Sequence, residues 1–277
     1  MKFRVTVLCD NSVGLVSGTL GEHGFSALVE WDGGSLLFDT GGGDTLVHNA
    51  TRLNRDLRKV SGVALSHGHY DHTGGLRQFL QLAGRKAIYA HPALFTPRYR
   101  VKDTGEALSI GIPFGEAYLR GIGAEFDFCE GSREIAPAIF LTGNVPRRNS
   151  FETGDSGMFC DSSGCHADPL ADDQSLVIVA EKGLVLLLGC CHAGVINTIE
   201  AARELTGVER VQAVIGGTHL GFCTAQQLAA TMNALRSMRV GKIYGAHCTG
   251  FHAAARMQQE LAGQFHPAMV GTSVEIK

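Results

Sequence analysis

Four side chains of the kinds that bind metal ions lie within one six-residue segment, in the order His67, His69, Asp71 and His72. Imidazole and carboxylate ligands together suit Zn²⁺, and also Fe or Mn. The two-residue spacing places His67 and His69 on the same side of an extended loop, where both can bind one ion. Asp71 and His72 stand at the entry of the following helix and can reach a second ion about 3.5–4 Å away. The pattern therefore predicts a site for two divalent ions, with Zn²⁺ as first choice.

The elements that must position these ligands are short apolar strands, which alternate with helical patterns along most of the chain. Their order repeats, because in each half a hairpin is followed by a helix and by a strand that ends at a histidine. From Asp39 to His67 the separation is 28 residues, and from Cys190 to His219 it is 29. We expect two related halves whose strand ends converge on one site. The two hairpin turns are predicted at residues 32–34 and 181–183.

Length and composition limit the architecture. The chain has 277 residues, of which 44% are apolar, and this suits a single domain over residues 1–277 with a full core. Residues 92–165 are rich in Gly and Pro and poor in regular patterns. We expect that segment to form a lid over the site within the same domain.

Net charge and cysteine spacing limit the classes of binding partner and the cellular compartment that the sequence allows. The formal net charge of −3 argues against binding to nucleic acid or an anionic membrane through bulk electrostatics. No apolar run approaches the roughly 20 residues of a membrane span, and the N-terminal segment lacks the apolar block of a signal peptide. The eight cysteines show no Cys-x-x-Cys spacing. We therefore expect a cytoplasmic protein with reduced cysteines that acts on a small molecule, with its oligomeric state left open.

The metal-binding segment follows an apolar strand, and upstream of it stands Leu37-Phe38-Asp39-Thr40-Gly41. Together these two segments resemble the signature of the metallo-β-lactamase superfamily. The resemblance implies an α/β fold, the four-layer αβ/βα sandwich, with the metals at the strand ends. It also implies that Asp39 orients a ligand without binding the metal itself. The last metal histidine of the superfamily corresponds to His247, which is expected to join Asp71 and His72.

Five further matches, spread over nearly the whole chain, carry a narrower resemblance. They are residues 22–26, 67–76, 189–194, 216–220 and 247–250. These segments resemble the group named for the dihydropterin-ribofuranosylaminobenzene-phosphate synthase of methanopterin biosynthesis. The resemblance implies a small phosphorylated substrate that is similar to a pterin.

The third ligand of the ion at His67 and His69 has two candidates. We favour His192, which lies in a Gly-flanked loop that belongs to the pattern of the narrower group. His166 competes, because its distance upstream of the strand ending at Gly189 resembles that in the hydrolase glyoxalase II. Many dinuclear members of the superfamily carry a bridging aspartate where this chain has Cys190. This thiol is expected to bind a metal, to leave a second ion more weakly held, or to be a buried structural residue.

Other residues are expected to act on the substrate. Asp71 is expected to orient the nucleophile as well as to bind metal, and His219 to bind substrate or transfer a proton. His23 and His91 are expected to line the cleft. A phosphate group needs cationic or backbone donors. The cations that the chain offers in and beside the lid are Arg98 first, then Arg100, Lys102, Arg147 and Arg148.

The sequence thus predicts a metal-dependent hydrolase in which a metal-bound hydroxide attacks a phosphoryl or acyl centre. One alternative is the synthase activity for which the narrower group is named. A second is redox chemistry at two irons, which the small number of carboxylates near the histidine cluster disfavours. A third is a non-catalytic, metal-dependent binding or sensor protein, since fold does not fix function. The acidic balance and the lack of a basic arm disfavour a nuclease.

Overall fold

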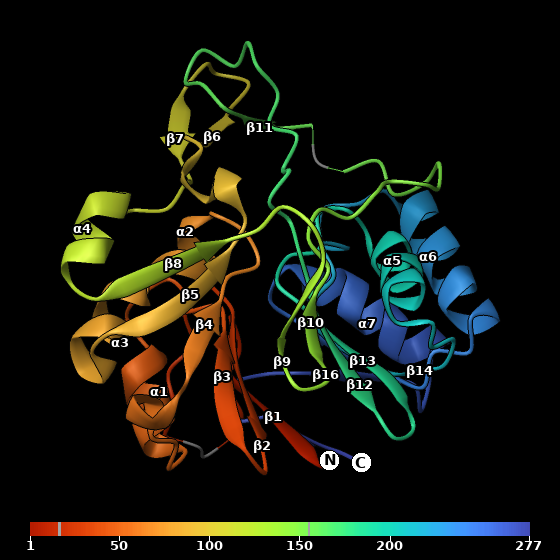
Figure 1. The fold of residues 1–277 in the computed structure, drawn as a ribbon. Helices are drawn as coiled ribbons and strands as arrows, with labels where there is room; N and C mark the ends of the chain where they lie inside the picture. Colours follow the sequence, from red (N-terminus) through yellow and green to blue (C-terminus); the bar gives the residue numbers. More distant parts are fainter. Residues whose placement is uncertain (16–17, 155) are drawn as a thin grey trace.

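The metal-binding segment of residues 67–72 follows a strand of the first sheet. The computed structural model describes residues 1–15, 18–154 and 156–277, and its strands form two large sheets and a small one (Figure 1). Strands in the first half of this sheet pair antiparallel, and those from β3 to β8 pair parallel. The order is β17 (Ser273–Ile276), β1 (Phe3–Cys9), β2 (Ser26–Trp31), β3 (Gly34–Phe38), β4 (Gly62–Ala64), β5 (Lys86–Ala90) and β8 (Ala124–Phe128).

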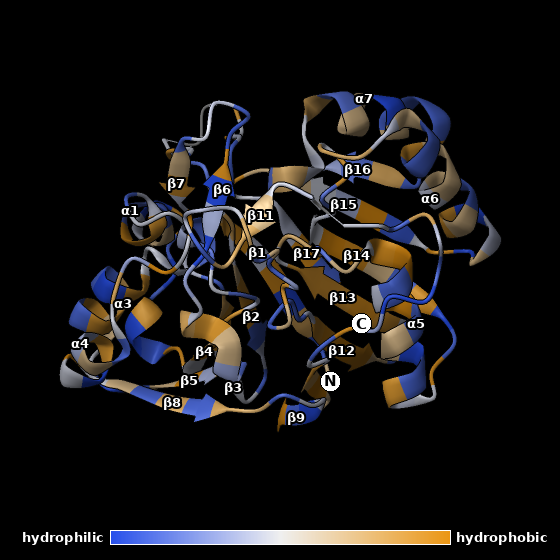
Figure 2. Cartoon of the chain, turned by 90° about the horizontal axis from the view of Figure 1, so that it is seen from above, coloured by the Kyte–Doolittle hydropathy of each residue, from blue (hydrophilic) through white to orange (hydrophobic). Residues whose placement is uncertain are grey.

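The second sheet faces the first. Its strands β13 to β16 run parallel, and the residues of β13 are buried along its whole length. A strand covered on both faces is expected to be a continuous apolar run, as β12, β13 and β14 are in Figure 2. The order is β16 (Phe265–Pro267), β15 (Lys242–Ala246), β14 (Val211–Gly217), β13 (Gly183–Leu188), β12 (Leu176–Ala180), β10 (Ile139–Leu141) and β9 (Arg133–Ala136).

Helices cover the outer faces of both sheets. Leu187 and Phe38 belong to one apolar core that draws residues from both sheets, while two other cores join each sheet to its own helices. The resulting layers are helix, sheet, sheet and helix, which confirms the predicted αβ/βα sandwich. The helices on the first side are α1 (Leu46–Arg52), α2 (Tyr70–Thr73), α3 (Leu76–Ala83) and α4 (Glu116–Gly121), and on the second α5 (Val195–Thr206), α6 (Ala225–Ser237) and α7 (Phe251–Glu260). Short 3-10 turns occupy Leu57–Lys59, Pro92–Phe95 and His247–Thr249.

The segment predicted as a lid is divided among three sheets. Only β6 (Tyr99–Val101), β7 (Ala107–Ser109) and β11 (Met158–Phe159) form a separate small sheet, which stands above the sandwich in Figure 1. Strand β8 extends the first sheet, and β9 and β10 extend the second. The part of residues 92–165 that stands apart from the two large sheets, here called the lid, is therefore only the small sheet of β6, β7 and β11. Its position over α2 is fixed by the backbone of Tyr70, whose N–H donates to the carbonyl of Ile110 at 3.0 Å.

The strand ends of the two halves meet, as the repeated element order predicts. Strands β2 and β3 form the first predicted hairpin, and β12 and β13 form the second. Each hairpin leads through a helix to a parallel strand, β4 in the first sheet and β14 in the second. The segments that follow β3, β4, β13, β14 and β15 carry the candidate ligands. Ligands gather at the carboxyl ends of such strands because the loops there are free to vary.

Among the described residues, no helix is long and apolar enough to cross a membrane.

Candidate metal centre

One group of three buried histidines has its ring nitrogens turned toward a common point. Ligand atoms of His67, His69 and His192 all lie within 4.8 Å of one another. His67 Nε2 is 2.9 Å from His69 Nδ1. Among the described residues, His69 Nε2 and both ring nitrogens of His192 are buried without a hydrogen-bond partner. Buried polar atoms of this kind are costly unless a ligand satisfies them, and three converging imidazoles suit Zn²⁺.

Burial keeps these three imidazoles neutral. It lowers the pKa of His67 and of His192 well below the usual value, and that of His69 to about 3. Neighbouring histidines add to the effect for His67 and His192, because two adjacent imidazolium charges repel. A neutral imidazole is the form that binds a metal ion, so this group fits a divalent cation.

A second group, next to the first, combines nitrogen, oxygen and sulfur ligands. Asp71 Oδ2 lies 3.3 Å from His247 Nε2 and 3.8 Å from His72 Nε2. His72 Nε2 is in turn 3.2 Å from the sulfur of Cys190. Burial opposes ionisation of Asp71, yet the surrounding histidines hold its pKa well below the usual value. An ionised carboxylate, two imidazoles and a thiol form a set of donors that fits a second divalent ion.

Asp39 orients His72 toward this second group. Its carboxylate is 2.7 Å from His72 Nδ1, and it accepts hydrogen bonds of 2.7 Å from both the backbone N–H and the hydroxyl of Ser66. Such a contact fixes the ring so that Nε2 faces the site. Burial lowers the pKa of His72, but the charges of Asp39 and Asp71 outweigh it and raise that pKa to about 9. The surroundings thus favour a positive charge at this ring, and a divalent ion bound at Nε2 would supply that charge in place of the proton, because only the neutral imidazole binds a metal.

Four residues at the strand ends adopt left-handed backbone conformations. Asp39, Cys191, His219 and His247 have φ values of 58°, 60°, 55° and 49°. They follow β3, β13, β14 and β15 respectively. For residues other than glycine this conformation costs about 1–2 kcal/mol each, and it persists where the surrounding structure requires it. The left-handed conformation of these four residues therefore points to the same site as the side chains do.

A buried ion-pair network supports the loop between His67 and His69. The guanidinium of Arg98 donates to Asp168 at 2.8 Å and to both oxygens of Asp172, at 2.9 and 2.6 Å. Asp172 also accepts the backbone N–H of Gly68 at 2.8 Å. Arg98, predicted to bind substrate, is only 1% exposed and fully engaged in this network. We therefore assign it a structural role. The sequence does not indicate this role, because the partners of Arg98 lie 70 and 74 residues away.

The remaining predicted residues are divided between the site and its surroundings. His166 has a side chain 81% exposed and pairs with Asp161 at 3.0 Å, so it lies outside both groups. His91 accepts the backbone N–H of Ala93 at 3.1 Å, which makes it the cap of a 3-10 turn. His23 reaches the site, with Nε2 3.1 Å from Asp71 Oδ2. The ring of His219 lies with its centroid 4.3 Å from that of His192.

Both ligand groups open into one cavity of about 280 Å³, here named the metal cavity. Its lining includes Asp71, His192 and residues of the small sheet. Cys248 and Phe222 also line it, and nothing in the sequence had assigned a role to either. Arg100 is the one arginine among the described lining residues.

Comparison with known proteins agrees with this geometry. The sequence pattern of the metallo-beta-lactamase superfamily matches residues 20–191. The 7,8-dihydropterin-6-methyl-4-(beta-D-ribofuranosyl)-aminobenzene-5'-phosphate synthase of Methanocaldococcus jannaschii is 27% identical over 98% of this chain and 96% of its own. A crystal structure described as a metal-dependent hydrolase of the beta-lactamase superfamily is 30% identical, with a TM-score of 0.84 over 98% of each chain. The Zn²⁺-bound PqqB of Methylobacterium extorquens is 13% identical, with a TM-score of 0.55 over 98% of this chain and 99% of its own, and shares the fold. The chain belongs to the metallo-beta-lactamase superfamily.

Proposed function

We propose that this protein is a hydrolase that uses two divalent ions, Zn²⁺ by first choice, to cleave a phosphate ester of a small molecule. The observation that carries the proposal is the meeting of two complementary ligand groups at one cavity, with Arg100 in its lining. The similarity to a protein described as a metal-dependent hydrolase supports the reaction class. The phosphate in the name of the Methanocaldococcus relative supports the substrate class.

In this reaction the residues would have separate roles. His67, His69 and His192 would hold one ion, and Asp71, His72 and His247, with Cys190 beside them, the other. When bound, the ions would activate a water molecule and polarise the phosphate oxygen. Arg100 would orient the phosphate through charge-assisted hydrogen bonds.

Two further histidines have places suited to proton handling. His219 lines the metal cavity beside His192, and from there it can give a proton to the departing oxygen. His23 is half exposed and hydrogen-bonded to Asp71, so it can fix the orientation of that carboxylate. Met158 of the small sheet and Ile110, which follows β7, add apolar surface to the cavity wall, and this surface would limit the access of bulk water.

The test combines metal content with turnover. Protein purified without chelator is assayed for metal per chain and for hydrolysis of p-nitrophenyl phosphate and bis-p-nitrophenyl phosphate. We expect about two ions per chain and measurable turnover, with turnover lost and metal content reduced in His67→Ala and in His247→Ala. His192→Ala is expected to lower metal content, whereas the matched control His166→Ala leaves it unchanged. Turnover that survives in His67→Ala and His247→Ala would exclude the metal-assisted mechanism.

A second candidate activity is that of the synthase itself. It is favoured by the match to the Methanocaldococcus enzyme over 98% of the chain. The two activities are separated by mass spectrometry, because only a synthase forms the joined product that the enzyme's name describes. Formation of that product without hydrolysis of the nitrophenyl esters would favour the synthase.

A further inference from the structure

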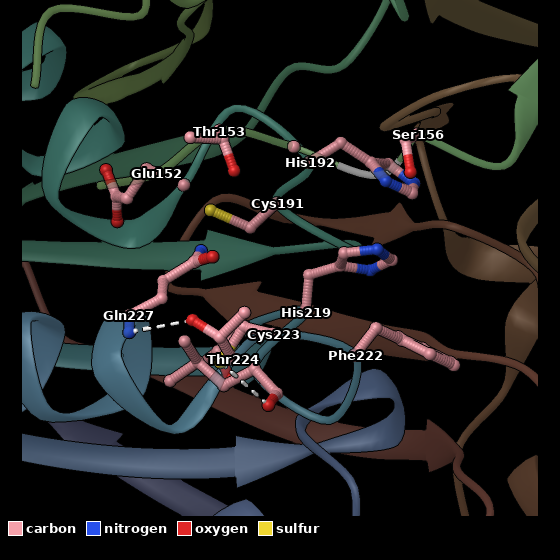
Figure 3. Close-up of a pocket in the computed structure, with 14 residues that line it drawn as sticks. Glu152, Thr153, Ser156, Cys191, His192, His219, Phe222, Cys223, Thr224 and Gln227 are labelled. Atoms are coloured by element: carbon pink, nitrogen blue, oxygen red, sulfur yellow. Dashed lines mark hydrogen bonds between the residues drawn. The ribbon is translucent and has the colours of Figure 1, made fainter. Parts of the chain in front are cut away.

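A second cavity opens beside the metal cavity. It has a volume of about 250 Å³, and it shares His192, His219 and Phe222 with the metal cavity. In Figure 3 these three residues lie at one end, while Glu152 and Gln227 lie at the other. We name this second cavity the side chamber. The residues that line it beyond the shared three include Glu152, Thr153, Ser156, Thr224 and Gln227.

The side chamber is polar but offers no cation. Its described lining contains hydroxyl groups and the amide of Gln227, with neither lysine nor arginine. Glu152 is 2% exposed, and its carboxylate accepts the backbone N–H groups of Ile196 and Asn197 at 2.8 and 2.9 Å. This carboxylate therefore caps α5 and adds negative charge to the chamber wall. A second phosphate would be repelled here, and an uncharged polar group would be accepted.

Phe222 gives the chamber entrance an aromatic surface. Its side chain lines both cavities although the residue is 62% exposed. The ring lies 4.9 Å from that of His219 at an interplanar angle of 37°, so the two form one continuous aromatic wall. An exposed ring at the junction of two ligand cavities is suited to stack against a flat ring of a substrate.

Gln227 supplies the means to recognise the edge of such a ring. Its backbone N–H donates to the hydroxyl of Thr224 at 3.1 Å, which makes the cap of α6. Its side-chain amide forms no hydrogen bond within the described part of the chain, and it lines the chamber. An amide carries both donors and an acceptor, so it can pair with the mixed donor and acceptor edge of a lactam or amino heterocycle.

We infer that the side chamber binds the flat, uncharged, hydrogen-bonding ring of a phosphorylated substrate, whose phosphate lies in the metal cavity near Arg100. The two cavities of about 250 and 280 Å³ are each below the usual size of a ligand site, and together they match one. The inference rests on the proposed function, which it deepens by naming the class of group attached to the phosphate.

The experiment compares a ligand that carries both the ring and the phosphate with one that lacks the ring and one that lacks the phosphate. Binding of guanosine 5′-monophosphate, ribose 5-phosphate and guanosine to the metal-loaded protein is measured by calorimetry. We expect the nucleotide to bind at least about tenfold more tightly than the sugar phosphate, the size of one stacking contact. Phe222→Ala and Gln227→Leu should each reduce this preference while leaving the affinity for ribose 5-phosphate within about twofold.

Two matched controls report on nonspecific effects. Gln226→Leu changes the neighbouring residue of α6, which lies outside the chamber lining, and Phe251→Ala removes another exposed ring, 81% exposed and outside both cavities. Neither should alter the preference for the nucleotide. Equal binding of nucleotide and sugar phosphate by the wild-type protein would overturn the inference, and so would a preference that Phe222→Ala and Gln227→Leu leave intact.

Failure of the proposed function gives a different result. If the nitrophenyl esters are not hydrolysed but guanosine binding still falls in Phe222→Ala and Gln227→Leu, the hydrolase proposal fails and the ring site stands. If the esters are hydrolysed and the ring adds no affinity, the hydrolase stands and the ring site is wrong.

Discussion

Cys190 and Cys191 are adjacent in the sequence, but their thiols face different surroundings. The sulfur of Cys190 lies 3.2 Å from His72 Nε2, at the second ligand group. Cys191 instead packs in the core between the second sheet and its helices, and its sulfur is 3.3 Å from the hydroxyl of Thr198. The left-handed conformation at Cys191, with φ of 60°, turns the chain between the two. Of the pair, only Cys190 is placed to act as a thiolate ligand.

This difference can be measured as metal content. We expect Cys190→Ala to reduce tightly bound metal from about two ions per chain to about one, because a ligand of the second ion is lost. Cys191→Ala is the matched control, and it should keep both ions while lowering stability through the lost core contacts. Metal analysis after exhaustive dialysis decides the matter. Equal metal content in the two variants would mean that Cys190 is a structural residue.

At the scale of elements, the buried pair of Arg98 and Asp172 joins the start of the lid to the metal-binding loop. Arg98 directly precedes β6, and Asp172 holds the N–H of Gly68. A side-chain carbon at Gly68 would collide with the carbonyl of Leu94 and with the guanidinium of Arg98, so only glycine fits there. The lid and the loop are therefore packed together, and a change in the ion pair should shift the positions of the metal ligands on the loop.

Replacement of Arg98 by leucine tests this unit. Because Asp168 and Asp172 would be left buried without their partner, we expect Arg98→Leu to cost about 3–5 kcal/mol of unfolding free energy. The control Arg120→Leu removes an exposed ion pair within α4 and should cost at most about 1 kcal/mol. Urea denaturation followed by circular dichroism gives both values. A similar small loss in the two variants would show that the buried pair adds little.

Because Glu152 caps α5 from a buried position, we expect the free energy of unfolding to depend on pH. Burial raises the pKa of Glu152 above its ordinary value of 4.5, so the folded protein binds this proton more tightly than the unfolded chain. The resulting stabilisation is complete below the unfolded value and is lost as the pH rises through the folded value. The unfolding free energy of the wild type minus that of Glu152→Gln should therefore fall as the pH rises above the ordinary value of 4.5.

Urea denaturation at several pH values measures that difference. Glu209→Gln serves as the control, since its side chain is 84% exposed and screened by water. Its difference from the wild type is expected to stay level. A level difference for Glu152→Gln as well would contradict the proposed effect of burial.

At the scale of the whole molecule, local patterns were easier to predict than distant contacts. The segment from His67 to His72 and the two hairpins depend on neighbouring residues, so the sequence predicts them directly. The convergence of Asp39 and Cys190 on His72 followed from the repeated order of elements. The partners of Arg98 did not, because ion pairs over 70 residues leave no periodic signal. The lid predicted over residues 92–165 is too wide because β8, β9 and β10 are short strands within that segment, although β8 alternates apolar and charged residues as a strand does.

The shared core predicts a single unfolding transition. Residues of both sheets pack together in it, so neither half retains its apolar face when the other unfolds. Trp31, the one tryptophan, lies at the end of β2 and reports on the first half through fluorescence. Circular dichroism reports on the helices of both halves. We expect the two signals to change at the same urea concentration, and separate midpoints would mean that the halves unfold independently.

The pairing of β1 with β17 affects the rate at which the chain folds. Arg4 contacts Glu275 across 271 residues, so the first sheet gains its outer strand through the most distant pairing in the sequence. Closing a loop of this length carries an entropic cost that must be met before the contact forms, which slows folding. The two strands run antiparallel and their outer ends lie together in Figure 1. A short linker from residue 277 to residue 1, with new ends opened in an exposed turn, would convert this contact into a local hairpin and accelerate folding.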